Sequence, residues 1–182
     1  MVFTRAQFDE LPEDGRWEVS SGRAVLMPFS APWHQGLSDD IVSSLRRQIL
    51  DPQRGWVVSA GTVFLPVPPG TRSEIQSRIP DIVVSRQRRP KGWPVGSPPE
   101  FVIEILSTRR GNVERTEKID DYARAGIEEY WIVNPIDRDV EIYALSAGEY
   151  MLVRKTQRPE SITFPGVEID MAPFWPNPAD FD

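Results

Sequence analysis

Two short stretches, IPDIVVS (residues 79–85) and EFVIEILS (residues 100–107), decide how this chain of 182 residues folds. Each is rich in valine and isoleucine and is bounded by proline or polar residues, which is typical of buried strands. Each also contains a carboxylate, because Asp81 opens the first apolar run and Glu104 lies inside the second. An isolated ionised carboxylate in an apolar setting is destabilising or has a raised pKa. Two such acids on successive strands therefore point to a compensating partner.

The surrounding sequence predicts an α/β fold with a mixed central sheet flanked by helices. Apolar residues recur at every fourth position from Trp33 to Ile49, which predicts an amphipathic helix over 33–50 with Ser30 as its cap. A second helix is expected to be capped by Asn112, to run to about Ala125 and to end at Gly126. Further strands are expected in 16–28 as a hairpin, in 56–67 as a strand or strand pair, and at 129–135, 139–145 and 149–156.

The whole chain, 1–182, is expected to form one domain, with 163–182 as a peripheral C-terminal tail. Cysteine is absent, which excludes disulfides and cysteine-ligated zinc. No apolar stretch is long enough to span a bilayer, and the first residues lack the apolar core of a signal peptide. These features predict a cytoplasmic protein with no membrane partner.

The charge distribution leaves the type of partner open. The formal net charge is -6, which argues against a nucleic-acid partner, because phosphate binding depends on lysine and arginine. Residues 72–118 nevertheless contain ten basic and six acidic residues, so this segment is positive and the remainder is strongly negative. The basic segment is either an ordinary solvated surface or a phosphate-binding face.

A third acid, Glu18, lies between Trp17 and Val19 in the first expected strand. If Glu18, Asp81 and Glu104 converge, a cation must offset their mutual repulsion. Hard oxygen ligands select Mg²⁺ or Mn²⁺, and Mg²⁺ takes one or two carboxylates while keeping several waters. The three acids therefore predict a divalent-metal site that is open to an oxygen of a ligand.

Lys118 lies in the second turn of the second expected helix, at the edge of its apolar stripe. From there it can reach the end of the acidic strand and, beside a metal, orient a water or stabilise charge on a phosphate. The spacing also favours an ordinary surface ion pair with Glu114, four residues earlier. Tyr122 either hydrogen-bonds a group of the site or, as the spacing favours, is a core aromatic residue whose hydroxyl lies at the rim.

The motifs PDIVV, FVIEILS and EKIDDYARAGIEEYWIVNP, preceded by DELPEDGRWEVSSGRAVLMP, resemble the Uma-two family of restriction-endonuclease-like proteins in the PD-(D/E)xK nuclease superfamily. The resemblance extends to about Tyr150. It implies a restriction-endonuclease-like sheet with acids at strand ends and metal-dependent hydrolysis of DNA. By position, Asp81 corresponds to the Pro-Asp acid, Glu104 to the second acid and Glu18 to the acid of the first strand.

The superfamily pattern places a lysine two residues after the second acid, where this chain has Leu106. The resemblance therefore implies that Lys118 has taken the lysine role. His34 also matches a family position and falls in the first turn of its helix, where it would contact a phosphate or serve as a capping or packing residue. Basic side chains on the loop after each acidic strand are expected to hold DNA phosphates: Arg86, Arg88, Arg89, Lys91, Arg109 and Arg110.

The favoured hypothesis is thus a Mg²⁺-dependent endonuclease in which a metal-activated water hydrolyses DNA phosphodiester bonds. Two alternatives remain open at this point. One is a non-catalytic interaction protein that retains the nuclease fold, and the other is a phosphohydrolase that acts on small nucleotides. A homodimer is expected, because nucleases of this class often pair two sites for the two strands.

Overall fold

The computed structural model describes residues 2–50, 53–88, 92–107 and 112–181, and of residues 112–117 the backbone alone. In this part of the chain, six strands form the main sheet in the order β10-β9-β8-β7-β6-β3. β7 and β8 run parallel and the other neighbours run antiparallel, so the sheet is mixed, as predicted. The strands are β3 (Trp56–Ser59), β6 (Ile82–Ser85), β7 (Phe101–Ile105), β8 (Glu129–Asn134), β9 (Asp139–Ser146) and β10 (Glu149–Thr156).

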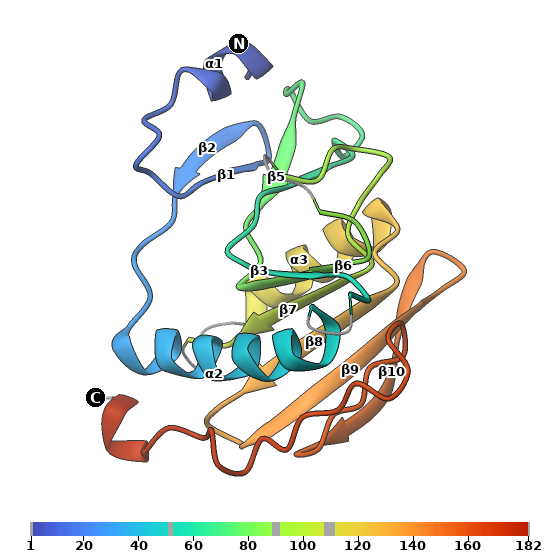
Figure 1. Cartoon of the computed structure of the whole chain (residues 1–182). Helices are drawn as coiled ribbons and strands as arrows, with labels where there is room; N and C mark the ends of the chain where they lie inside the picture. The colour runs from blue at the N-terminus through green and yellow to red at the C-terminus, as the bar shows by residue number, and fades with distance from the viewer. Residues whose placement is uncertain (1, 51–52, 89–91, 108–111, 182) are drawn as a thin grey trace.

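Two helices cover opposite faces of the main sheet (Figure 1). α2 (Pro32–Ile49) packs on the face formed by Ile82, Phe101 and Ile103, whereas α3 (Asn112–Ala125) packs on the face formed by Val83 and Val102. Successive side chains of a strand point to opposite faces, so a strand buried on both faces reads as a continuous apolar run. This explains why IVVS and FVIEI do not alternate with polar residues.

A second, smaller sheet was not foreseen. Its order is β2-β1-β5-β4, and all its strand pairs are antiparallel. The strands are β1 (Trp17–Ser20), β2 (Arg23–Leu26), β4 (Val63–Leu65) and β5 (Gln76–Arg78). The expected hairpin in 16–28 is confirmed as β1 and β2, and its turn residues Ser21 and Gly22 both have positive φ angles.

The apolar run 56–67, expected to be a strand or a strand pair, forms two strands that belong to different sheets. β3 belongs to the main sheet and β4 to the small one, and the chain bends between them at Ala60, whose φ is 50°. At Gly61 a Cβ atom would lie 2.7 Å from the ring of Trp93. A glycine is needed there because the buried indole packs directly against the backbone.

The helix termini agree in part with the predictions. α1 (Arg5–Asp9) begins with a capping box, because the Thr4 side chain accepts from the backbone of Gln7 and the Gln7 side chain accepts from the backbone of Thr4. The predicted cap of α2 by Ser30 is wrong, because Ala31 is the N-cap and makes no side-chain hydrogen bond. A short 3₁₀ helix, η1 (Pro178–Phe181), ends the described chain.

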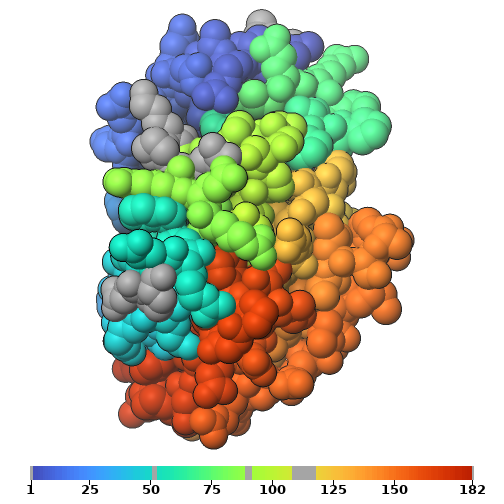
Figure 2. Space-filling view, turned by 45° about the vertical axis from the view of Figure 1, so that its right-hand side comes forward, coloured from blue at the N-terminus to red at the C-terminus, as the bar shows by residue number. Residues whose placement is uncertain are grey.

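The first part of the C-terminal segment packs into the core, which the prediction of a peripheral tail over residues 163–182 did not foresee. Phe164, Val167, Ile169 and Met171 are buried in the same core as α2. Figure 2 shows this segment in red between α2, in cyan, and the β9–β10 hairpin, in orange. Glu129 of β8 anchors it by accepting hydrogen bonds from groups of residues 161–163 at 2.7 to 3.1 Å.

None of the helices in the described part of the chain has both the length and the apolar character needed to cross a bilayer.

Candidate active site

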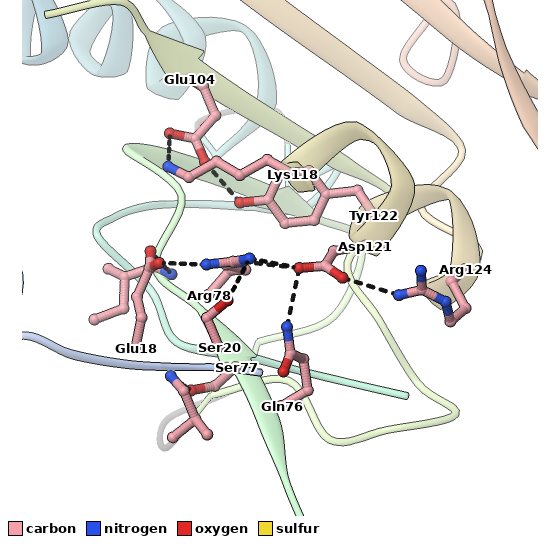
Figure 3. A network of polar contacts seen from close by, with 12 residues as sticks. Glu18, Ser20, Gln76, Ser77, Arg78, Glu104, Lys118, Asp121, Tyr122 and Arg124 are labelled. Carbon is pink, nitrogen blue, oxygen red and sulfur yellow. Dashed lines mark hydrogen bonds and ion pairs between the residues drawn. The ribbon is translucent and has the colours of Figure 1, made fainter. Parts of the chain in front are cut away.

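Glu104 occupies the fourth position of β7, a strand in which every residue is buried. Like Val102, it faces α3, because it is two residues away along the strand. Lys118 and Tyr122 are four residues apart on α3 and therefore share one face of the helix. The ammonium of Lys118 lies 3.0 Å from Glu104 Oε2, and the hydroxyl of Tyr122 donates to Oε1 at 2.6 Å (Figure 3). Of the two placements considered for Lys118, its side chain thus takes the one that reaches inward to the acidic strand.

Burial dominates the electrostatics of this group. Desolvation raises the pKa of Glu104 to about 7, with Asp81 and Glu18 contributing in the same direction and Lys118 and Tyr122 opposing it. Burial alone would lower the pKa of Lys118, but the three carboxylates more than offset this and raise it. Burial raises the pKa of Tyr122 well above its usual value. At neutral pH, Lys118 is therefore an ammonium ion and Tyr122 a neutral donor.

Asp81 immediately precedes β6 and lies beside the end of β7. Its Oδ2 accepts from the backbone N–H of Ile105 at 2.8 Å. The same oxygen lies 3.4 Å from Nε2 of His34, which in turn lies 3.1 Å from the carbonyl oxygen of Ile105. Burial lowers the pKa of His34, but its contacts with Asp81 and Ile105 and the charge of Glu104 outweigh burial and raise it. His34 thus links the first turn of α2 to the acids.

Asp81, Glu104, Lys118 and His34 line a common cavity of about 210 Å³, which we call the acidic pocket. Arg16 and the segment 27–31, which connects β2 to α2, complete its wall. Asp81 has 14% of its side chain exposed and Glu104 has 9%, so both carboxylates are largely buried but remain accessible from the pocket. The pocket therefore combines oxygen ligands with an ammonium group.

Glu18 does not line the acidic pocket. One of its oxygens accepts from the backbone N–H of Ile79 at 2.9 Å and the other from Arg78 at 3.1 Å. Among the described residues, no three histidine, aspartate or glutamate side chains are grouped so as to hold a metal ion. The expected cluster of three converging acids is therefore not assembled. Glu18 lies close enough to influence the charge state of Glu104 but is held by an arginine.

A buried arginine, which the sequence analysis did not single out, organises the polar groups behind the pocket (Figure 3). Arg78 of β5 pairs with Glu18 of β1 and with Asp121 of α3, the latter at 2.8 Å, and also donates to Ser20 at 3.0 Å. Gln76 donates to the same oxygen of Asp121 at 3.0 Å. The small sheet is thereby connected to the helix that carries Lys118 and Tyr122.

The spacing on α3 contained a signal for one of these residues. Asp121 is three residues after Lys118 and adjacent to Tyr122, so it belongs near the inward face of the helix. Arg78 gave no comparable signal, because QSR has no apolar pattern that would predict a fully buried strand.

The basic residues predicted to bind phosphate do not join the acids where the structure describes them. Arg86 and Arg88 follow β6 at the end opposite Asp81, roughly 15 Å along the strand. Arg86 donates to the carbonyl oxygen of Thr163 at 2.9 Å, and Arg88 lies over the ring of Trp56. Four further predicted residues lie outside the described residues: Arg89, Lys91, Arg109 and Arg110. The side chain of Glu114, the alternative partner of Lys118, is also outside them.

Comparisons with known proteins agree with the architecture. The sequence matches the family model of Uma2, described as "Putative restriction endonuclease", over residues 5–172. A crystal structure from Anabaena variabilis, described as a putative nuclease belonging to DUF820, has a TM-score of 0.71 and 17% sequence identity. The alignment covers 97% of this chain and 98% of that one, and at this identity it shows a shared fold. No curated protein matches the sequence.

Arg78→Ala is expected to destabilise the protein by about 3–5 kcal/mol, because it leaves Glu18 and Asp121 buried without their cation. Arg124→Ala is the matched control, since Arg124 pairs with Asp121 at the more exposed end of the same network and should cost less than about 1 kcal/mol. Urea unfolding measures both changes. Equal stability losses in the two variants would contradict the role assigned to Arg78.

Glu104→Gln is expected to change how stability depends on pH. The folded-state pKa of Glu104 is raised from 4.5 to about 7, so between these values the folded state binds more protons than the unfolded state. The stabilisation that Glu104 gains from its raised pKa is fully present below pH 4.5 and is lost as the pH rises through about 7. The stability of wild type relative to Glu104→Gln should therefore fall across this window in urea unfolding. The exposed Glu149→Gln variant should show no such trend, and a constant difference for Glu104→Gln would refute the assignment.

Proposed function

Because the chain belongs to the Uma2 family, whose description is "Putative restriction endonuclease", we propose that it is a metal-dependent nuclease that hydrolyses DNA phosphodiester bonds. One observation carries the proposal: Asp81 and Glu104, from successive strands, share a pocket with the ammonium of Lys118. Each of these two nearly buried acids costs desolvation free energy, and both lie at the wall of a cavity where a ligand could offset that cost.

The groups in the acidic pocket suit Mg²⁺ or Mn²⁺. Mg²⁺ in nucleotide-processing sites takes one or two carboxylates, keeps several waters and completes its shell with phosphate oxygens. Asp81 and Glu104 would provide the carboxylates. A site that needs substrate oxygens also accounts for the lack of a complete ligand cage among the described residues. Glu18 acts in this proposal through its charge and through Arg78.

A divalent cation held there would lower the pKa of a bound water and neutralise charge on the phosphate. The side chains around the pocket would position and stabilise the reacting groups. Lys118 remains charged and faces the pocket, so it would stabilise negative charge that develops on the phosphoryl oxygens. Tyr122 fixes the rotamer of Glu104 through its short hydrogen bond. His34 and the N–H of Ile105 hold Asp81 in place.

The test is cleavage of supercoiled, linear and branched DNA in the presence of Mg²⁺. Lys118→Ala and Glu104→Ala should each lower the rate at least about a hundredfold, because each removes a charge that acts at the reacting phosphate. Lys155→Ala is the matched control, since Lys155 pairs with Asp139 and Glu141 in the β9–β10 hairpin, outside the pocket lining. Products should carry a 5′-phosphate.

Equal nicking by wild type and both pocket variants would identify the activity as a contaminant. Mg²⁺ binding without cleavage of any DNA would instead favour the non-catalytic alternative, and hydrolysis of mononucleotides alone would favour a small-molecule phosphohydrolase.

A further inference from the structure

A second cavity adjoins the acidic pocket and has a different character. It measures about 360 Å³ and is lined mainly by apolar side chains of two segments, among them Pro12, Trp17, Leu26 and Phe29. We call it the apolar pocket. It shares Arg16, the segment 27–28 and Phe29 with the lining of the acidic pocket, so these residues form a wall common to the two cavities.

Phe29 is the most exposed large apolar side chain in the described part of the chain, with 93% of its surface accessible. Leu26, on the same segment, is 55% exposed. A single exposed apolar residue is ordinary, but an exposed aromatic ring and an exposed leucine that line the same apolar pocket form a contact surface. The flat face of Phe29 is free to receive another ring.

Arg16 provides a cation at the junction of the two cavities. Its Nε atom is buried and has no hydrogen-bond partner among the described residues, although buried polar atoms nearly always have one. Its backbone carbonyl accepts from the N–H of Met27 at 2.8 Å, which holds this residue against the β2–α2 segment. Asp14 also lines the apolar pocket, so the cationic character is local to Arg16.

We propose that the apolar pocket binds one unpaired nucleotide next to the scissile phosphate, with its base stacked on Phe29 and its phosphate held by Arg16. The inference rests on the proposed nuclease function and specifies its substrate as DNA with a single-stranded segment, such as a flap or a frayed end. A base inside a duplex has both faces covered by its neighbours and cannot stack on a side chain without being unstacked. Aromatic stacking of an exposed base is favourable and tolerant of sequence.

The first test measures binding in EDTA, so that the result is independent of hydrolysis. A fluorescently labelled single-stranded oligonucleotide is titrated with the full chain and its variants. Phe29→Ala should weaken binding by a factor of about 10, because one stacking contact is lost, and Phe29→Trp should restore it. Binding of a blunt duplex should change much less. Leu152→Ala is the matched control, since Leu152 is 53% exposed on β10 and lines neither cavity.

The second test uses salt dependence to separate the two roles. Loss of one phosphate contact to a single strand lowers the slope of log affinity against log salt by about 0.7. Arg16→Ala should reduce the slope by this amount, whereas Phe29→Ala should weaken binding without changing the slope. An unchanged slope in Arg16→Ala would remove the phosphate contact from the proposal.

Equal affinity of wild type and Phe29→Ala for single strands, or an equal loss for single strands and duplex, would overturn the stacking site. These outcomes are distinct from a failure of the nuclease proposal. Cleavage that depends on Lys118 but not on Phe29 would leave the nuclease in place and remove the stacking site. If binding depends on Phe29 but the chain cleaves no DNA, the stacking site would stand and the nuclease proposal would be wrong.

Discussion

The desolvation of one carboxylate, Glu104, constrains the rest of the fold. Glu104 has only 9% of its side chain exposed within a strand that is buried on both faces, so its charge must be compensated from within the protein. Lys118 and Tyr122 provide that compensation from α3, which lies in the crossover between the parallel strands β7 and β8. Parallel neighbours need such a crossover, and a helix that returns over the sheet naturally faces the strand it left. The fold and the acidic pocket thus share one topological cause.

The small sheet contributes to the same centre through Arg78. Its guanidinium pairs with Glu18 and Asp121, so a strand of the small sheet and the helix over the main sheet are tied by one buried cation. Such a pair is costly to break because either partner alone would be an uncompensated buried charge. His34 connects α2 to the same centre, because its ring contacts the carbonyl oxygen of Ile105 and the carboxylate of Asp81. Three elements that are far apart in sequence therefore meet behind or beside the acids.

Much of this arrangement was predictable from local pattern. The two apolar runs, the fourfold spacing in α2 and the turn residues at Ser21 and Gly22 identified the strands, the helix and the hairpin, because these signals depend on short-range periodicity. The acids and Lys118 were found as exceptions to that pattern. The meeting of Asp81, Glu104 and Lys118 in one pocket follows from topology, and the family resemblance supported it, whereas Glu18 stays outside this pocket.

The features that escaped prediction depend on long-range partners. β5 has no apolar signal, since its buried side chains are polar and bind to residues such as Asp121 and Glu18. Glu18 was expected to bind a metal ion but pairs with Arg78 instead. The residues next to Glu18 in the sequence give no sign of this partner, which comes from another strand. The C-terminal segment looked peripheral from its prolines, but Glu129 of β8 accepts hydrogen bonds from the backbone of Ile162 and Thr163, where this segment begins.

Calorimetric titration of Mg²⁺ into the full chain tests most directly whether the two buried acids are arranged for a cation. Wild type should bind Mg²⁺, and Asp81→Ala and Glu104→Gln should each weaken binding by at least about tenfold. Asp170→Ala, which removes an exposed acid remote in sequence from the pocket residues, should bind as wild type does. Mg²⁺ affinity that survives loss of either Asp81 or Glu104 unchanged would contradict the account.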